Sequence, residues 1–308
     1  MRFAVEAWAP EYGSSIDDGG LDVTSAPVDP NVEVDSDAWA PMRPPATERP
    51  RLVFVDGVRR VDARVWIHDQ QGLATPGLCA TVAAGAVLAE PGRASLVAAE
   101  VCRGVYSSAA ELAAIDTSCG TYRPCRVASP TPEALILEVQ MRMAALEHHI
   151  ASQVGEGAVV VVDGPLRGRE HAPGAVGYIK TQHVRYLPDA LEIIVGRLAA
   201  GERTPLFCIG GRFTRLSWYL RLPGAIAHPR SGIVRCEVDG DTPLADAIAR
   251  ADQVSGVLPA FASRPHKDSR APQNLYPIAG LERELRRRLG DPTVCERSLR
   301  RASPVHER

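Results

Sequence analysis

Two runs of apolar, mostly β-branched residues each end in an aspartate followed by a glycine. Leu52-Val53-Phe54-Val55 leads into Asp56-Gly57, and Val159-Val160-Val161-Val162 leads into Asp163-Gly164. An apolar run of this length without polar alternation predicts a strand buried on both faces of a sheet. A carboxylate at the end of such a strand lies at the rim of the sheet, where open α/β folds bind ligands. Two such carboxylates, far apart in the sequence, predict a divalent metal site and chemistry on phosphate esters.

The composition of the 308 residues is that of a globular protein, with 45% hydrophobic and 23% charged residues. No apolar stretch approaches the roughly 18–20 residues that a membrane helix needs. The first residues include Glu6, Glu11, Asp17 and Asp18, whereas a secretory signal needs a basic start and an apolar core. The seven cysteines are scattered and contain no CxxC pair, which is typical of reduced thiols. We therefore expect a cytoplasmic protein that does not contact membranes.

Charge divides the chain into three regions. Residues 1–50 hold ten acids against three arginines, a net charge of −7, whereas the whole chain carries −2. We interpret 1–50 as an acidic, Pro/Gly-rich extended arm, 51–292 as the catalytic domain and 293–308 as a basic tail. The motif Ala-Trp-Ala-Pro occurs at 7–10 and at 38–41. Its tryptophans could pin the arm onto the globular body or onto a second subunit, or the repeat could be chance within a linker.

From residue 51 the pattern predicts strands first and then alternating helices and strands. We expect strands at 51–58 and 61–68 joined by a tight hairpin at Arg59-Arg60, because Val61, Ala63, Val65 and Ile67 alternate with polar residues. Further strands are expected at 76–90 and 94–106, then a helix at 131–153 and the strand ending at Asp163. The remaining expected elements are helices at 188–200, 243–253 and 277–289 and strands at 205–209, 216–222 and 232–238. This order predicts an α/β fold with a ribonuclease H-like mixed sheet flanked by helices.

Phosphodiester hydrolysis by two metal ions needs three or four acids that meet at one sheet edge. Mn²⁺ and Mg²⁺ prefer carboxylate oxygens. The helix that precedes the second strand can supply the next acid, and matching helix rise to strand rise favours Glu147, with Glu138 as the alternative. Glu100 is a further candidate at the rim. The alternative is a purely structural role, in which each Asp-Gly is an ordinary turn and the helix acids are solvated surface residues.

The arginines between 283 and 301 also allow two interpretations. They could form a face that follows a phosphate backbone, or they could be the solvated side of an amphipathic helix.

Several segments together resemble the NurA nuclease family, over roughly residues 51–290 and in the family's order. They are Phe54-Val55-Asp56-Gly57, Val161-Val162-Asp163-Gly164-Pro165-Leu166, Gly177-Tyr178-Ile179-Lys180, Tyr219-Leu220-Arg221, Val234-Arg235-Cys236-Glu237-Val238 and Asn274-Leu275-Tyr276-Pro277-Ile278. No single segment is specific, whereas the ordered set is.

The resemblance implies a ribonuclease H-like, Mn²⁺-dependent DNA nuclease with exonuclease and single-strand endonuclease activity. It implies a homodimer that works with a HerA-type hexameric translocase in DNA end processing at double-strand breaks. The family's two aspartates fall on Asp56 and Asp163, and its helix glutamate falls on Glu147. By the same resemblance, Lys180 contacts the scissile phosphate and Tyr276 lines the site.

The sequence departs from the family at two positions. Val58 follows the first Asp-Gly, where many relatives have serine. The C-terminal helix has Gly280-Leu281-Glu282 where some relatives have a histidine, so that Glu282 replaces this group or the group is missing. These departures leave two alternatives open. One is a catalytically weakened binding subunit of a translocase complex, and the other is an RNA-directed or phage-defence nuclease of the same fold.

Overall fold

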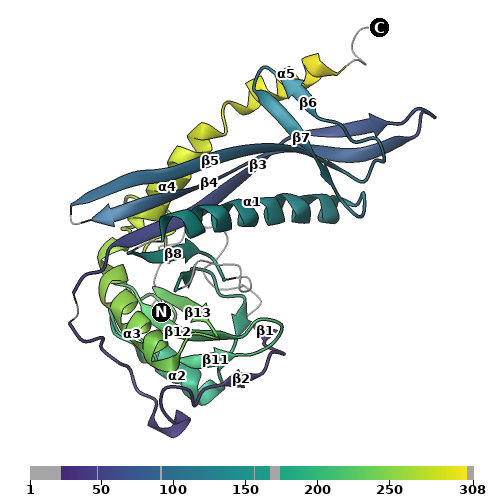
Figure 1. Ribbon diagram of the computed structural model, residues 1–308. Coiled ribbons are helices and arrows are strands. Elements are labelled where there is room, and N and C mark those ends of the chain that lie inside the picture. Colours follow the sequence, from purple (N-terminus) through teal and green to yellow (C-terminus); the bar gives the residue numbers. More distant parts are fainter. Residues whose placement is uncertain (1–21, 47, 91, 156, 167–173, 304–308) are drawn as a thin grey trace, which may run out of the picture. The chain divides into compact units, whose positions relative to one another are not determined.

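The structure is a computed structural model that describes residues 22–46, 48–90, 92–155, 157–166 and 174–303 (Figure 1). The chain has a mixed α/β fold, in which a large mixed sheet is flanked by helices. It divides into two compact units. The first unit consists of Met1–Phe54, Leu88–Ser95 and Val154–Ala279, and the second of Val55–Val87, Leu96–Gln153 and Gly280–Arg308.

The first unit has a sheet in which a buried strand is covered on both faces. Its strands are, in spatial order, β2 (Val28–Asp29), β11 (Phe207–Ile209), β12 (Arg215–Arg221), β13 (Ile233–Asp239), β9 (Val176–Ile179), β8 (Val159–Asp163) and the start of β3 (Leu52–His68). The neighbours from β2 to β9 are antiparallel, whereas β9 and β8 are parallel. A separate two-stranded sheet pairs β1 (Asp22–Val23) with β10 (Val184–Arg185).

Alternation along β12 explains how the helices of this unit pack. Trp218 packs with residues of α3 (Leu244–Val257), whereas Tyr219 belongs to the cluster around α2 (Asp189–Arg197). Successive side chains of a strand point to opposite faces, so α3 covers one face and α2 the other. The short helix η3 (Leu258–Phe261) follows α3 and adds Phe261 to the α3 side.

The second unit is built on three long strands. Its spatial order is β3, β4 (Ala74–Glu90), β5 (Arg93–Ser107), β7 (Gly120–Arg126) and β6 (Ile115–Thr117), and its helices are α1 (Pro132–Val154), α4 (Tyr276–Arg288) and α5 (Pro292–Ala302). Ala80 of β4 packs with Leu135 of α1, whereas Ala83 packs with Leu281 of α4. The long strands are therefore buried between α1 on one face and α4 on the other.

The hairpin predicted at Arg59-Arg60 is wrong, because β3 runs without interruption from Leu52 to His68. A two-residue hairpin needs positive φ angles in its turn. No described residue other than glycine has a positive φ, and Gly57 is not among the glycines that do. Two arginines cannot supply this backbone conformation at low cost, so the alternating pattern simply continues as one strand.

The acidic arm is attached to the first unit of its own chain through its second tryptophan. Trp39 is buried, its ring centroid lies 6.3 Å from that of Phe207, and its Nε1–H donates to Pro30 O at 3.0 Å. β2 extends the sheet by pairing with β11, and the short helix η2 (Ser36–Ala38) leads into Trp39. Trp8 lies outside the described residues. For Trp39, therefore, the first alternative holds: this tryptophan pins the arm onto the globular body of its own chain.

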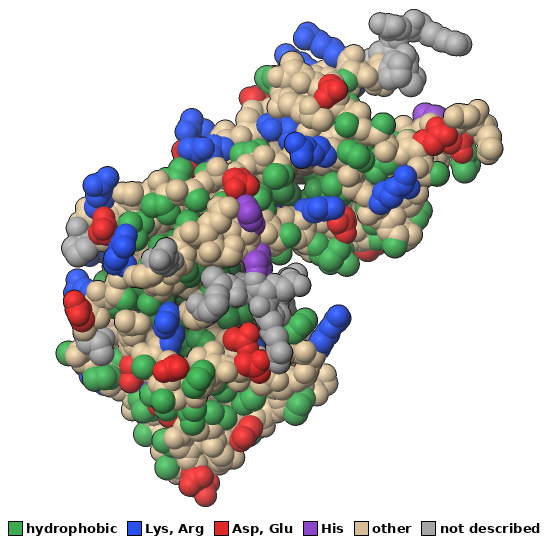
Figure 2. Space-filling model, viewed as in Figure 1, with side chains coloured by type: hydrophobic (Ala, Val, Ile, Leu, Met, Phe, Trp, Pro, Cys, Tyr) green, Lys and Arg blue, Asp and Glu red, His purple; other side chains and the backbone are tan. Residues whose placement is uncertain are grey.

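Residues 292–302, most of the expected basic tail, form helix α5. The Asp291 side chain caps the helix by accepting from the Val294 N–H at 2.9 Å, and Pro292 occupies the first turn. Figure 2 shows several Lys and Arg side chains over the surface where Figure 1 draws α4 and α5. Glu284 pairs with Arg287 and Arg288, and Glu296 pairs with Arg300. This arrangement fits the solvated face of amphipathic helices.

No described helix has the length and apolarity to cross a membrane. All seven cysteines are free thiols.

Candidate functional site

Asp163 is the last residue of β8, where the run of four valines ends. Those valines are buried, whereas Asp163 keeps partial access to solvent. Gly164 turns the chain directly after it, with a φ of +112° that favours glycine, and its N–H donates to Tyr178 O at 2.8 Å. The Asp-Gly pair therefore ends the strand and leaves the carboxylate at the strand terminus.

Lys180 lies beside Asp163 and is held there by a second contact. Its Nζ donates to Asp163 Oδ2 at 2.5 Å and to Asn274 Oδ1 at 3.1 Å. Asn274 is fully buried, and its Nδ2 donates to Asp268 Oδ2 at 2.8 Å. Both partners of the Asp163–Lys180 ion pair have side chains that are 11% exposed. The network fixes the ammonium group next to the carboxylate.

Tyr178 joins the strand beside Asp163 to the segment that carries Asn274. It lies opposite Asp163 in the parallel register of β8 and β9. Its hydroxyl donates to Gln273 O at 2.6 Å. Burial raises the pKa of Tyr178 well above its ordinary value, so this phenol keeps its proton and its hydrogen bond throughout the working pH range.

The second unit contains the other predicted aspartate, on β3. Asp56 is buried, and its Oδ1 accepts the Gly57 N–H at 2.8 Å. Glu282 of α4 brings a carboxylate oxygen within 4.8 Å of one from Asp56. Val58, two residues along the strand, packs with Leu281 next to Glu282, so Asp56 and Val58 share the face that α4 covers.

Of the two helix acids proposed as the third ligand, Glu147 lies against this part of β3. A Cβ placed on Gly57 would meet Glu147 Oε1 at 2.3 Å and Met143 Cγ at 2.9 Å, so only glycine leaves room for this carboxylate. Glu138 instead pairs with Arg142 at 3.3 Å, one turn along the helix. The absence of a side chain at Gly57 thus brings Glu147 close to the backbone that carries Asp56.

The remaining predicted residues have other partners in the described contacts. Glu100 of β5 lies 3.7 Å from His149 of α1, and both side chains are substantially exposed. Tyr276 is half-buried at the start of α4, where the Lys267 ammonium lies 5.8 Å from its ring centroid.

Sequence reasoning missed a buried ion pair beneath the segment that follows Asp163. Glu237 and Arg235, both buried on β13, pair with each other, and Glu237 Oε1 accepts the Leu166 N–H at 2.7 Å. Burial by itself lowers the pKa of Arg235, but the attraction of Glu237 and of two tyrosines raises it overall. Alternate spacing on one strand was the available signal, because residues 235 and 237 share a face. Through Glu237, this ion pair anchors the chain at Leu166, three residues beyond Asp163.

No protein-family model matches the chain, and no curated protein matches it. Among solved structures, the NurA nuclease from Sulfolobus solfataricus is similar, with a TM-score of 0.50 and 10% identity over 86% of this chain and 88% of that chain. The catalytic domain of human endonuclease V has a TM-score of 0.31 and 16% identity, over 79% of this chain and 85% of that chain. The first comparison shows that this chain has the fold of the NurA structure. The second is too distant to carry an argument.

Proposed function

We propose that the chain is a metal-dependent nuclease that hydrolyses the phosphodiester bonds of DNA, on a ribonuclease H-like sheet. The Asp163–Lys180 pair carries the proposal. It combines an acid and a cation, held 2.5 Å apart at the end of a buried strand, in a chain with the fold of the NurA nuclease. A carboxylate at this position suits a divalent cation, and an ammonium group suits a phosphate oxygen.

The acids present fit a hard metal ion. In the second unit, Asp56 and Glu282 bring carboxylate oxygens within 4.8 Å of one another, and Glu147 lies against Gly57. Asp163 is proposed as a further ligand. Carboxylate oxygens are the ligands preferred by Mn²⁺ and Mg²⁺, so this donor set suits either ion. Such an ion, when bound, neutralises charge on the phosphate and lowers the pKa of the attacking water.

The protein groups around the acids have separable tasks in this proposal. Lys180, held by Asn274, binds a non-bridging oxygen of the scissile phosphate and orients it for attack. Asp268 acts through Asn274, because it accepts the amide hydrogen that fixes the rotamer of Asn274. Tyr276 lines the approach to the site. A homodimer, a HerA-type translocase partner and a preference for Mn²⁺ follow from the family resemblance and stay predictions.

An assay with end-labelled single-stranded and double-stranded DNA tests the proposed activity. We expect cleavage with Mn²⁺ or Mg²⁺ and none with excess chelator, because the acids alone cannot neutralise the phosphate. Parallel arms with RNA and with an RNA–DNA hybrid identify a ribonuclease by its substrate preference. Cleavage that persists in chelator would rule out the metal mechanism, and binding without any cleavage would favour the weakened, non-catalytic alternative.

Replacement of the helix acids tests which of them serves the reaction. We expect Glu282→Gln to lower the rate by at least about 100-fold, beyond the 10–100-fold typical of a group that only supports a metal ligand. Glu138→Gln is the matched control, since Glu138 pairs with Arg142 and lies on α1; its rate should stay within about twofold of the wild-type rate. Initial rates at saturating Mn²⁺ measure both. Equal rates for the two variants would mean that Glu282 does not take part in the reaction.

A further inference from the structure

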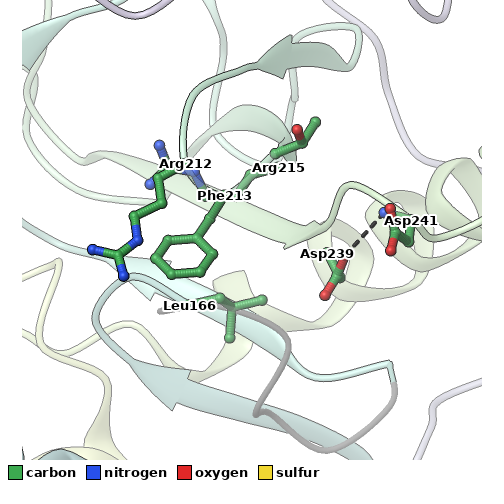
Figure 3. Close-up of a pocket in the computed structure, with 7 residues that line it drawn as sticks. Leu166, Arg212, Phe213, Arg215, Asp239 and Asp241 are labelled. Atoms are coloured by element: carbon green, nitrogen blue, oxygen red, sulfur yellow. Dashed lines mark hydrogen bonds between the residues drawn. The ribbon is translucent and has the colours of Figure 1, made fainter.

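A small cavity in the first unit lies next to the segment that follows Asp163. It has a volume of about 100 Å³, well below the roughly 300–1,000 Å³ of pockets that enclose drug-sized ligands. It therefore has room for a single ring system. Its lining residues are Leu166, Arg212, Phe213, Thr214, Arg215, Asp239 and Asp241 (Figure 3).

An exposed aromatic ring forms one wall of this cavity. The Phe213 residue is 44% exposed, although a large apolar side chain gains stability from burial. The Arg212 guanidinium lies 5.6 Å from the ring centroid, and Figure 3 shows Leu166 beside the same ring. A ring that is held by neighbours yet open to solvent can stack on a flat ligand.

The positive and negative charges of the cavity lie at different ends. Arg212 flanks the ring, and Asp239 and Asp241 lie together away from it, with the Asp241 N–H donating to Asp239 Oδ1 at 2.9 Å (Figure 3). Arginines suit phosphate oxygens, whereas carboxylates repel phosphate but accept hydrogen bonds from the amino groups of bases.

The position of the cavity relative to Asp163 is fixed by β13. Leu166 lines the cavity three residues beyond Asp163, which limits the separation along the chain to roughly 10 Å. The bond from the Leu166 N–H to Glu237 holds this segment on the sheet. A nucleotide near a phosphate bound at Asp163 and Lys180 can therefore reach the cavity.

We infer that this cavity binds one unpaired base of a DNA strand, with the base stacked on Phe213 and the flanking phosphates at Arg212 and Arg215. The inference rests on the proposed function and specifies its substrate as a single strand near the scissile bond. A base within a duplex is already stacked and paired, so it cannot enter a ring-sized cavity without being flipped out. The cavity thus favours single-stranded DNA over paired DNA.

Binding measured without catalysis tests this inference. Fluorescence anisotropy of labelled single-stranded oligonucleotides in chelator should show that Phe213→Ala weakens binding by about 5- to 150-fold, the loss of one stacked base. Phe213→Tyr should bind like wild type, and Phe213→Leu should bind like Phe213→Ala, because leucine keeps apolar bulk without a stacking face. Ile226→Ala is the matched control, since Ile226 is an exposed apolar residue of the same unit at 64% exposure. A blunt duplex should bind all variants equally.

Unchanged single-strand binding by Phe213→Ala overturns the inference, and so does wild-type binding by Phe213→Leu. An equal loss with the blunt duplex also overturns it, because a paired base needs no such cavity. A separate cleavage assay with Mn²⁺ distinguishes this failure from failure of the proposed function. If the wild type cleaves while Phe213→Ala binds normally, the base site is wrong and the nuclease stands. If the wild type cleaves nothing while Phe213→Ala loses binding, the base site stands and the nuclease proposal is wrong.

Discussion

Replacing Asp163 with asparagine is expected to lower metal-dependent DNA cleavage by at least about 1,000-fold, equivalent to about 4 kcal/mol of transition-state stabilisation. Asparagine has nearly the same shape as aspartate, so the strand end and its turn stay intact. The neutral amide, however, is a poor ligand for a hard cation and offers no charge to the Lys180 ammonium, which now lies 2.5 Å from the carboxylate. Single-turnover rates with labelled single-stranded DNA at several Mn²⁺ concentrations measure the loss.

The control for this variant is Asp189→Asn, which makes the same chemical change in the same unit. Asp189 lies in the first turn of α2, its side chain is 83% exposed, and it pairs with Arg185. Its cleavage rate should stay within about twofold of wild type. Thermal unfolding of both variants checks that the fold is intact. If folded Asp163→Asn cleaves DNA as fast as Asp189→Asn does, Asp163 does not take part in the reaction.

The sequence predicted β8 well because local chemistry dictates it. Four β-branched residues in succession favour a buried strand, and Gly164 supplies the positive φ that ends it. The helix expected at 131–153 is α1, Pro132–Val154, since Thr131 and Pro132 mark its start. Both elements are encoded within a few residues of where they form.

The arrangement around Lys180 could not be predicted in the same way. The Lys180–Asn274 contact joins residues 94 positions apart, and nothing in the local pattern of either segment specifies its partner. The hairpin expected at Arg59-Arg60 was wrong for a related reason. Period-two alternation identifies a strand, but it does not tell one long strand from two short ones unless a glycine or asparagine marks the turn. The packing of Val58 against α4, next to this position on β3, is again a contact between residues that are far apart in the sequence.

A second contact that the sequence pattern does not predict joins the acidic arm to the rest of the first unit. Arg203 is fully buried and binds both carboxylate oxygens of Glu33 at 2.8 Å and one of Asp252 at 2.7 Å. Glu33 Oε2 also accepts the Leu206 N–H at 2.7 Å. Burial by itself lowers the pKa of Arg203, but its hydrogen bonds to Glu33 and Asp252 raise it overall. The guanidinium therefore stays charged and neutralises two acids at the edge of the core.

Arg203→Met should lower the free energy of unfolding by about 3–5 kcal/mol, because removing one partner of a buried ion pair leaves the other charges uncompensated. Methionine fills similar volume, so lost packing contributes little. Arg43→Met is the matched control, since Arg43 pairs with Glu202 at 3.4 Å while its side chain is 74% exposed; exposed pairs contribute at most about 1 kcal/mol. Urea unfolding followed by tryptophan fluorescence measures both, provided that the slope with urea is unchanged. Equal midpoints for the two variants would mean that the arm is not held to the first unit by Arg203.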